Sequence, residues 1–225
     1  MQRKMRRALL VVVLALGAGG ASQAQTIITY GSLSGFNTAL GAAPMTVEDF
    51  TGTSHFPIPS GVLNSLTNLP GIGIFPGTIQ PGVTYSTPVT SGLFFNIDAG
   101  GGFTGGFLDN AAVGTGPLTI TFDSPAGAFG FDTDNLIVAP FTITINFTSG
   151  SPYNNSFSVS SSTPTFFGFQ STSANITSVV IGGGSGPHSF AIDNFRFTSV
   201  PEPSTFWLIG GGLAALLGLR RRHRA

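Results

Sequence analysis

Two segments of this sequence alternate strictly between apolar and polar residues, and this pattern constrains the fold more than any other feature. The alternation runs through residues 118–122 and 141–147. Because successive side chains of a β-strand point to opposite faces of a sheet, a period of two is typical of strands with one buried face. The pattern therefore predicts two half-buried strands.

Weaker patterns of the same kind predict further strands. They cover residues 45–50, 93–97, 128–131, 165–169, 176–181 and 189–197. Turn-forming pairs such as Ser124-Pro125 and Ser151-Pro152 separate them. Residues 57–88, rich in Pro, Gly, Ser and Thr, are predicted to form long loops with one or two strands, and no helical stripe is evident between the chain ends. The expected fold class is all-β, an antiparallel β-sandwich of jelly-roll type.

The alternation changes phase within the last of these strands. Phe190 and Ile192 fall on one face of the pattern, whereas Phe195 and Phe197 fall on the other, and Asp193-Asn194 lies at the change. One extra residue in a strand exchanges its faces. The sequence therefore predicts a β-bulge at Asp193-Asn194.

The charges are segregated along the chain. Arginine and lysine gather in the first seven and the last six residues, whereas residues 25–200 hold one arginine, Arg196, and eight acidic residues. Because nucleic-acid binding depends on cations that neutralise phosphates, this acidic region disfavours a DNA or RNA partner. The absence of cysteine excludes disulfides, thiolate catalysis and cysteine metal sites.

The amino end is typical of a secretory signal peptide. Basic residues up to Arg7 precede an apolar run from Ala8 to Leu16, and Ser22-Gln23-Ala24 has small residues at the positions of a cleavage site. The apolar run is shorter than the ~20 residues that span a bilayer. We expect cleavage near Ala24, so that residues 1–24 are a signal peptide and residues 25–199 a β-sandwich surface domain.

The carboxyl end has three parts in order. Pro201-Glu202-Pro203 is followed by an uncharged apolar stretch at residues 206–219 and then by an arginine cluster. A helix of that length rises about 21 Å, which is short of the ~30 Å bilayer core. The stretch is thus a marginal transmembrane helix, and the arginines favour a cytoplasmic end. An ordinary tail anchor is the alternative interpretation.

These three parts resemble the PEP-CTERM sorting signal of Gram-negative bacteria, over residues 200–225. The resemblance implies recognition by a membrane-embedded exosortase through Pro201, Glu202 and Pro203. It also implies transient anchoring in the bacterial membrane after export, cleavage near this motif, and release to the cell surface or extracellular matrix. Short pieces of the middle region, such as 47–50 and 191–195, resemble lectin-like jelly-roll domains.

A calcium site is predicted where the two ends of the domain meet. A jelly roll commonly places its first and last strands side by side, which would bring Glu48 and Asp49 close to Asp193 and Asn194. Calcium prefers several oxygen ligands of these types. The alternative is that these residues are solvated carboxylates and turn caps. Residues 131–135 also hold two aspartates, and there a turn is the favoured interpretation.

No catalytic constellation is evident, and we expect no enzyme activity. No cofactor is certain, and a structural calcium ion is the one candidate. The first functional expectation is a structural role in the matrix or envelope. The alternative is a carbohydrate-binding module for exopolysaccharide, and a glycan hydrolase is a distant third, because paired carboxylates need a defined separation.

Overall fold

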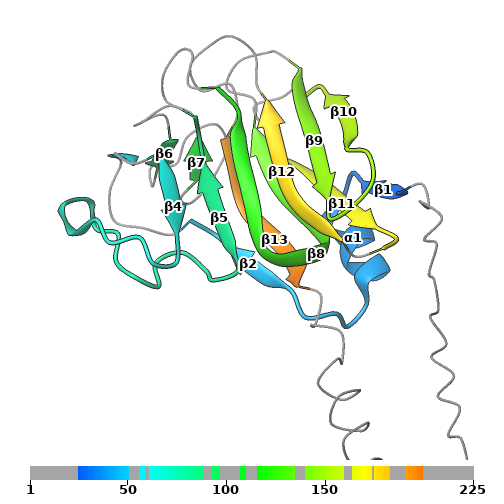
Figure 1. Cartoon of the computed structure of the whole chain (residues 1–225), viewed down its shortest axis with the longest axis horizontal. Helices are drawn as coiled ribbons and strands as arrows, with labels where there is room; N and C mark the ends of the chain where they lie inside the picture. The colour runs from blue at the N-terminus through cyan, green and yellow to red at the C-terminus, as the bar shows by residue number, and fades with distance from the viewer. Residues whose placement is uncertain are drawn as a thin grey trace, which may run out of the picture.

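The computed structural model describes ten stretches of the chain. They are residues 25–50, 56–58, 61–88, 93–96, 107–109, 116–134, 140–159, 164–173, 175–182 and 191–199. The strands within them pair in antiparallel fashion throughout, and they form two layers (Figure 1). The predicted all-β, antiparallel fold class is therefore confirmed.

The layer nearer the viewer in Figure 1 is here called the front sheet. Its strands in spatial order are β4 (Val62–Asn64), β5 (Val83–Ser86), the first part of β8 (Leu118–Asp134), β12 (Ile176–Gly182), β9 (Phe141–Phe147) and β10 (Tyr153–Phe157). β10 and β4 are its two edges among the described residues. The 3₁₀ helix η1 (Pro70–Ile72) lies in the connection between β4 and β5.

The layer behind it is the back sheet. Its strands are β1 (Ile27–Tyr30), β11 (Thr165–Ser171), the second part of β8, β13 (Ala191–Ser199), β2 (Thr46–Glu48), β7 (Phe107–Asp109), β6 (Leu93–Asn96) and β3 (Phe56–Ile58). β2 and β7 both pair with β13, at different points along it. The early strand β2 thus lies beside the last strand, as the jelly-roll interpretation expects.

Strand β8 joins the two layers. Its residues up to Phe122 pair with β5 and with β12, whereas its residues from Ala126 onward pair mainly with β11 and β13. The strand bends between these parts, at the Ser124-Pro125 pair that was expected to end it. Because proline removes one ladder donor without ending the extended conformation, the strand turns a corner there instead of stopping.

The core fills the space between the sheets. Side chains that alternate along the strands, such as Ile143 and Ile145 of β9, are fully buried. Aromatic rings cross the interior: Phe122 of the front sheet lies 6.2 Å from Phe195 of the back sheet, between ring centroids. The phenylalanine-rich composition is thus explained by packing, since each such ring buries a large apolar area.

A short helix that the sequence did not predict covers part of the outer face of the back sheet. Helix α1 (Leu33–Leu40) begins at Ser32, whose Oγ accepts a hydrogen bond from the Gly35 N–H, and it buries Phe36 completely. The Phe36 ring packs against Phe166 and beside Gly168, where an added Cβ would lie 2.7 Å from the ring. Tertiary packing therefore stabilises a helix whose own residues are mediocre helix formers.

The predicted bulge in the last strand is confirmed. β13 advances by three residues between Asp193 and Arg196, while its partner β8 advances by two, from Asp132 to Gly130. Asn194 has a φ of 48° at this point. As a result Ile192 and Phe195 are both fully buried, although they are three residues apart in sequence.

Candidate functional site

Two carboxylates lie opposite each other at the bulge. Asp193 of β13 is the direct partner of Asp132 of β8. Asp193 is 7% exposed, and its carboxylate accepts hydrogen bonds from the backbone N–H of Asn194 and, at 3.0 Å, from the Asn194 side-chain amide. The bulge thus places two carboxylates side by side and supplies donors to one of them.

Arg196 lies beside this pair. Its Nη1 is 3.5 Å from Oδ2 of Asp132 and donates a hydrogen bond to the carbonyl oxygen of Asn194 at 2.8 Å. The guanidinium also lies over the ring of Phe166, 5.9 Å from its centroid. The charge of Arg196 therefore compensates that of Asp132 most directly. The hydrogen bonds to the Asp193 carboxylate come from the backbone N–H and the side-chain amide of Asn194.

The pKa of Asp193 is raised to about 7. Burial is the largest cause, the Asn194 amide opposes it, and the negative charges of Asp132 and Asp49 raise the pKa further. Arg196 lowers it by a smaller amount. Near neutral pH, the carboxyl group of Asp193 is therefore partly protonated, whereas an ordinary exposed aspartate is ionised.

Glu48 has a different role from the one expected for a metal ligand. Its two carboxylate oxygens accept hydrogen bonds from the backbone N–H groups of Phe50, at 2.9 Å, and of Gln80, at 2.6 Å. Phe50 has a φ of 48°, which is unusual for a bulky residue. Glu48 therefore holds the turn after β2 against the loop before β5, and burial raises its pKa despite these two bonds.

Tyr85 of β5 extends this buried region. Its ring contacts Phe50 and Phe195 edge-on, at centroid distances of 5.3 and 5.8 Å. Its hydroxyl is fully buried and has no hydrogen-bond partner among the described residues. Burial, together with the charge of Glu48, raises the pKa of Tyr85 well above its usual value. The sequence offered no signal for this residue, because only the fold brings β5 next to β2 and β13.

The predicted calcium ligands lie close in the fold without converging as a set. Glu48 is the cross-strand partner of Phe195, whose side chain is in the core. Asp193 is instead the cross-strand partner of Asp132. Among the residues that the structure describes, no three acidic or histidine side chains are grouped so as to hold a metal ion. Calcium binding by Glu48, Asp49, Asp193 and Asn194 stays a prediction, without support from this arrangement.

Asp132 was not predicted to be part of this group. A turn was the favoured interpretation for residues 131–135, but residues 131–134 belong to the second part of β8. Residue 135 lies outside the described residues. That expectation was wrong because Asp and Asn favour turns only on average, and here cross-strand pairing on both edges of β8 overrides the preference.

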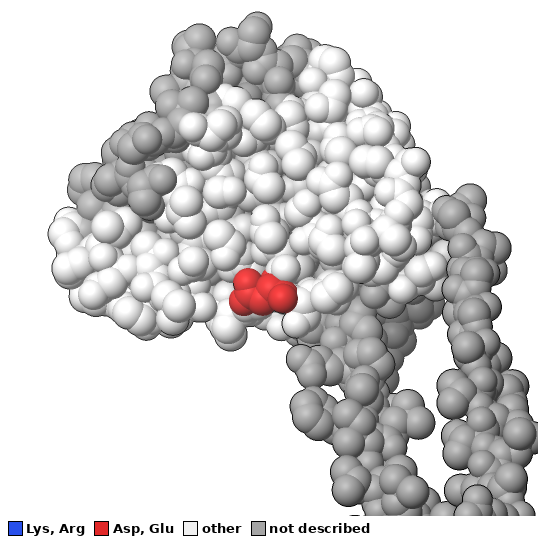
Figure 2. All heavy atoms as spheres, in the orientation of Figure 1, with Lys and Arg blue, Asp and Glu red and all other residues white. Residues whose placement is uncertain are grey.

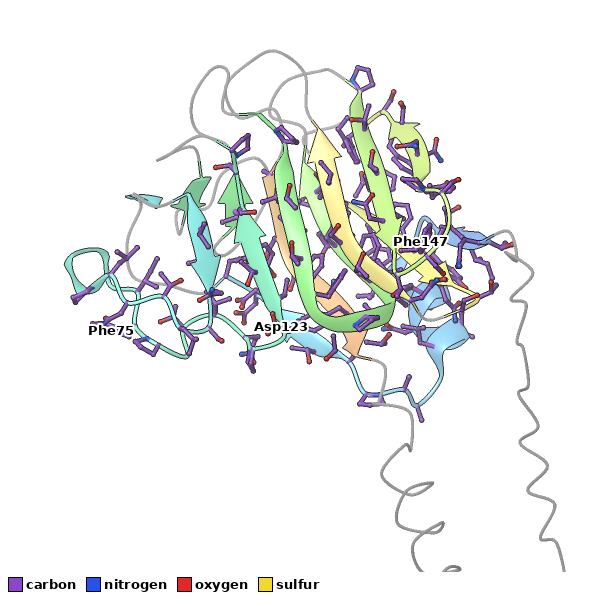
Figure 3. The ribbon with its side chains drawn as sticks, viewed as in Figure 1. Phe75, Asp123 and Phe147 are labelled. Atoms are coloured by element: carbon purple, nitrogen blue, oxygen red, sulfur yellow. The ribbon has the colours of Figure 1, made fainter. Side chains whose placement is uncertain are left out.

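A second candidate site is the outer face of the front sheet. Register places most of its outward residues in two long cross-strand rows, and Gly182, Thr142 and Ser156 form a shorter third row at the β9–β10 end. The first row is Asn64, Thr84, Thr121, Ser178 and Asn146, and the second is Val62, Ser86, Thr119, Val180, Thr144 and Asn154. None of these residues is charged. In Figure 2, which shows this face, no cation is visible and a single acidic patch lies at the lower edge, where Figure 3 labels Asp123.

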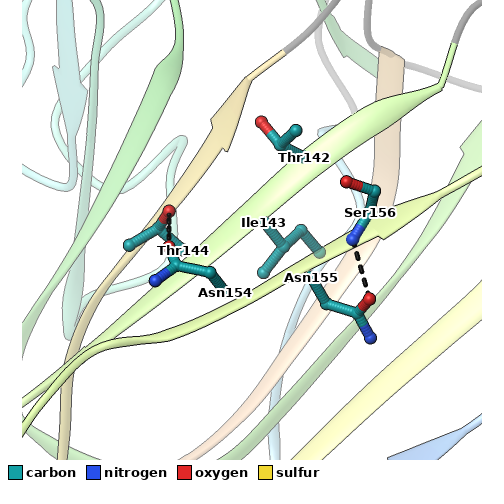
Figure 4. A pocket seen from close by; sticks show the side chains of 6 residues that line it. All are labelled: Thr142, Ile143, Thr144, Asn154, Asn155 and Ser156. Atoms are coloured by element: carbon teal, nitrogen blue, oxygen red, sulfur yellow. Dashed lines mark hydrogen bonds between the residues drawn. The ribbon is translucent and has the colours of Figure 1, made fainter.

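A depression of about 550 Å³ lies at the β9–β10 end of this face (Figure 4). Polar side chains and the backbone of two strands line it: Thr142, Ile143, Thr144, Asn154, Asn155 and Ser156. Thr144 Oγ1 donates to Asn154 Oδ1 at 2.7 Å, and Asn155 Oδ1 accepts from the Ser156 N–H at 2.8 Å. These bonds fix the side chains that surround the depression.

The predicted sorting residues Pro201, Glu202 and Pro203 lie outside the described residues. The same is true of the signal peptide at 1–24 and of the apolar stretch at 206–219. Within the stretches that the structure does describe, no helix has the length and apolar character needed to cross a membrane.

Comparison with protein-family models gives one match. Residues 199–222 match the model described as PEP-CTERM protein-sorting motif. The predicted sorting signal is therefore confirmed, and it marks the chain for export and exosortase-dependent sorting to the cell surface. The match covers the carboxyl end alone and does not include the β domain.

Comparison of the whole sequence with curated proteins gives no match. Solved structures with some similarity include the family 11 carbohydrate-binding module from Clostridium thermocellum in complex with a β-1,3-1,4-mixed-linked tetrasaccharide. That match has 12% identity, covers 67% of this chain and 99% of the module, and has a TM-score of 0.31. The family 11 module of the cellulase Lic26A-Cel5E of the same organism matches with 14% identity, 72% and 99% coverage and the same TM-score. At this level of similarity, no property of these modules is transferred to the chain.

Proposed function

We propose that this protein is a non-enzymatic component of the bacterial cell surface or extracellular matrix, released there after an exosortase removes its carboxyl end. The observation that carries the proposal is the position of β13. This strand is paired on both edges and ends at Ser199, directly before the Pro-Glu-Pro motif. β13 therefore ends before Pro201, so that cleavage near Pro201-Glu202-Pro203 leaves the described strands intact.

The composition of the domain supports a structural role. The interior formed by the described residues is a closely packed core rich in aromatic side chains, such as the stacked rings of Phe129 and Phe169. The acidic charge of residues 25–200, with Arg196 as the only cation, keeps such a protein soluble outside the cell and repels copies from one another at low salt.

Export and processing are tested with a variant of the sorting motif. The full chain and a variant with Pro201→Ala, Glu202→Ala and Pro203→Ala each carry one epitope tag after Gln25 and another after Ala225. We expect the unaltered chain to reach the cell exterior with the first tag and without the second. The variant should keep both tags and remain in the membrane fraction, and equal release of the two chains would contradict the proposal.

A second candidate function is binding of exopolysaccharide, and the uncharged front sheet favours it. A surface designed for solubility is commonly given about 25–35% charged residues. By contrast, the front-sheet strands, up to Phe122 in β8, contain no charged residue. Such a face offers hydroxyl and amide groups without ionic contacts, which suits a ligand rich in hydroxyl groups.

A further inference from the structure

We propose that the outer face of the front sheet is a docking surface for an uncharged polysaccharide chain, anchored in the depression between β9 and β10. The inference rests on the second candidate function above and adds its site and its ligand class. It depends on three features of this face: the geometry of its rows, its lack of charge and its lack of aromatic or apolar patches.

The rows provide an extended track. Neighbouring strands lie about 4.8 Å apart, so the six-strand row from Val62 to Asn154 spans about 24 Å. Polar groups recur along it at each strand except at Val62 and Val180. A linear chain laid across the strands would therefore meet two pairs of polar groups, Ser86 with Thr119 and Thr144 with Asn154, separated by Val180. The neighbouring row from Asn64 to Asn146 would offer a second set of partners.

The depression provides the anchor. The Thr144 hydroxyl donates a hydrogen bond to Asn154 Oδ1, and this bond orients the Asn154 side-chain amide. The amide nitrogen of Asn154 has no partner among the described residues, so it can donate to a ligand hydroxyl. Thr142 and Ser156 are exposed cross-strand partners that also line the depression, and their hydroxyls can either donate or accept.

The absence of charge selects the ligand class. A polyuronate or another polyanion would gain nothing here, because the cation among the described residues, Arg196, belongs to the back sheet and is engaged by Asp132. Asp123 at the edge of the face would repel such a polymer. A neutral polymer avoids this repulsion and needs no desolvated ion. The face therefore favours a neutral polysaccharide over an acidic one.

A protein or a lipid surface fits this face less well. Protein interfaces rely on buried aromatic and arginine anchors, and insertion into lipid needs a contiguous apolar surface. The most exposed large apolar side chains, Leu66 and Phe75, lie outside the rows, in the β4–β5 connection. Figure 3 labels Phe75, and within the rows only Val62 is an exposed large apolar side chain. The same lack of aromatic platforms predicts weak binding at a single site, with a Kd on the order of 0.1–1 mM. Many copies in a matrix would compensate through avidity.

The test is native gel electrophoresis of the full chain, kept soluble in detergent, through gels that contain a neutral β-glucan, dextran, a polyuronate or no polymer. The first variant, Thr121→Val with Thr144→Val, removes two hydroxyls and keeps β-branched side chains. The second, Thr144→Asp, places a charge beside the depression. The control is Asn37→Asp on α1, an exposed position that covers the other sheet. Thermal unfolding of each variant checks that it is folded.

We expect a neutral polymer to retard the unaltered chain and the control, and we expect both front-sheet variants to lose at least about ten-fold in affinity. If the front-sheet variants are retarded as strongly as the unaltered chain, the proposed site would be wrong, although the chain would still bind polysaccharide. Retardation by the polyuronate alone would overturn the ligand class. If none of the polymers retards the chain while export and processing are intact, this inference and the second candidate function would both be overturned. The proposed matrix role would not be affected by that result. Self-association that depends on Thr144 would assign the face to protein contacts instead.

Discussion

Asp193 and Asp132 are direct cross-strand partners at the bulge of β13, and Arg196 lies near Oδ2 of Asp132. Two carboxylates at opposed positions repel each other when both are ionised. The pKa of about 7 for Asp193 follows from burial together with this repulsion and that of Asp49. The relationship makes the stability of the domain dependent on pH in the neutral range.

The first prediction concerns that dependence. Because the pKa of Asp193 in the folded protein lies above its ordinary value of 3.8, the folded protein binds more protons than the unfolded chain between these pH values. The free energy of unfolding should therefore fall as the pH rises from about 4 to about 7. Asp193→Asn should raise the melting temperature at pH 8 by about 2–4 °C, equivalent to about 1 kcal/mol, and change it little at pH 4.

The matched control for this prediction is Asp123→Asn. Asp123 is exposed at the edge of the front sheet, so its substitution should have a similar small effect at both pH values. A gain for Asp193→Asn that does not vary with pH would reject the titration of Asp193 as its cause.

The calcium prediction can be tested on the same protein. A calcium ion held by Asp49 and Asp193 would bind the folded state alone and raise the melting temperature of the chelator-treated domain. It would also remove the advantage of Asp193→Asn at pH 8. An unchanged melting temperature in millimolar calcium would reject the calcium site and leave the proton as the group that neutralises Asp193.

The second prediction concerns the buried hydrogen bonds of Glu48. Glu48→Gln keeps the size of the side chain but replaces one of two acceptors by a donor that faces a backbone N–H. We expect a loss of about 2 kcal/mol in the free energy of unfolding, measured in urea. Val47→Gln, on the neighbouring exposed position of β2, should cost less than about 0.5 kcal/mol. Equal losses for the two variants would mean that the Glu48 bonds contribute nothing specific.

The third prediction concerns two tyrosines that differ in their partners. Tyr85→Phe removes a buried hydroxyl without a hydrogen-bond partner, so stability should stay equal or increase by about 1 kcal/mol. Tyr30→Phe removes the 2.6 Å hydrogen bond from Tyr30 to Gln170 Oε1 and should decrease stability by about 1 kcal/mol. A marked loss for Tyr85→Phe would show that its hydroxyl has a partner in solution.

The fourth prediction concerns the surface of the back sheet on which helix α1 packs. Gly168→Ala would place a Cβ 2.7 Å from the Phe36 ring and 2.9 Å from the Phe166 ring, both of which are closely packed. We expect a loss of about 1–3 kcal/mol, with the helix displaced from the sheet. Gly31→Ala, where nothing lies within 4 Å of the new Cβ, should be close to neutral. Similar stability for the two variants would contradict the close packing of Phe36 on this face.

The sequence predicted those parts of the fold whose signal is local. The strand at 141–147 agrees at both ends with β9, because its alternation is uninterrupted, and the phase change at Asp193-Asn194 identified the bulge. β10 was missed because its polar residues, Tyr153–Phe157, have no alternation to detect. Helix α1 was missed because Phe36 is held by Phe166, Ala128 and the close approach of Gly168, a surface that only the folded sheet creates.

The candidate sites were less predictable, for a related reason. Glu48 and Asp193 were singled out from the expected adjacency of first and last strands, and β2 does pair with β13. The face to which each side chain points depends on register, which places Glu48 opposite Phe195 and Asp193 opposite Asp132. The uncharged rows of the front sheet join residues from strands far apart in sequence, so no single segment revealed them.

We propose that cleavage removes both ends of the chain and that the β domain between them is stable by itself outside the cell. The most direct test is the intact mass of the protein recovered from the cell exterior. We expect the mass of a chain that begins after Ala24 and ends near Pro201–Pro203, without the arginine-rich end. Recovery of the chain only from the membrane or the cytoplasm, with residues 206–225 still attached, would contradict it.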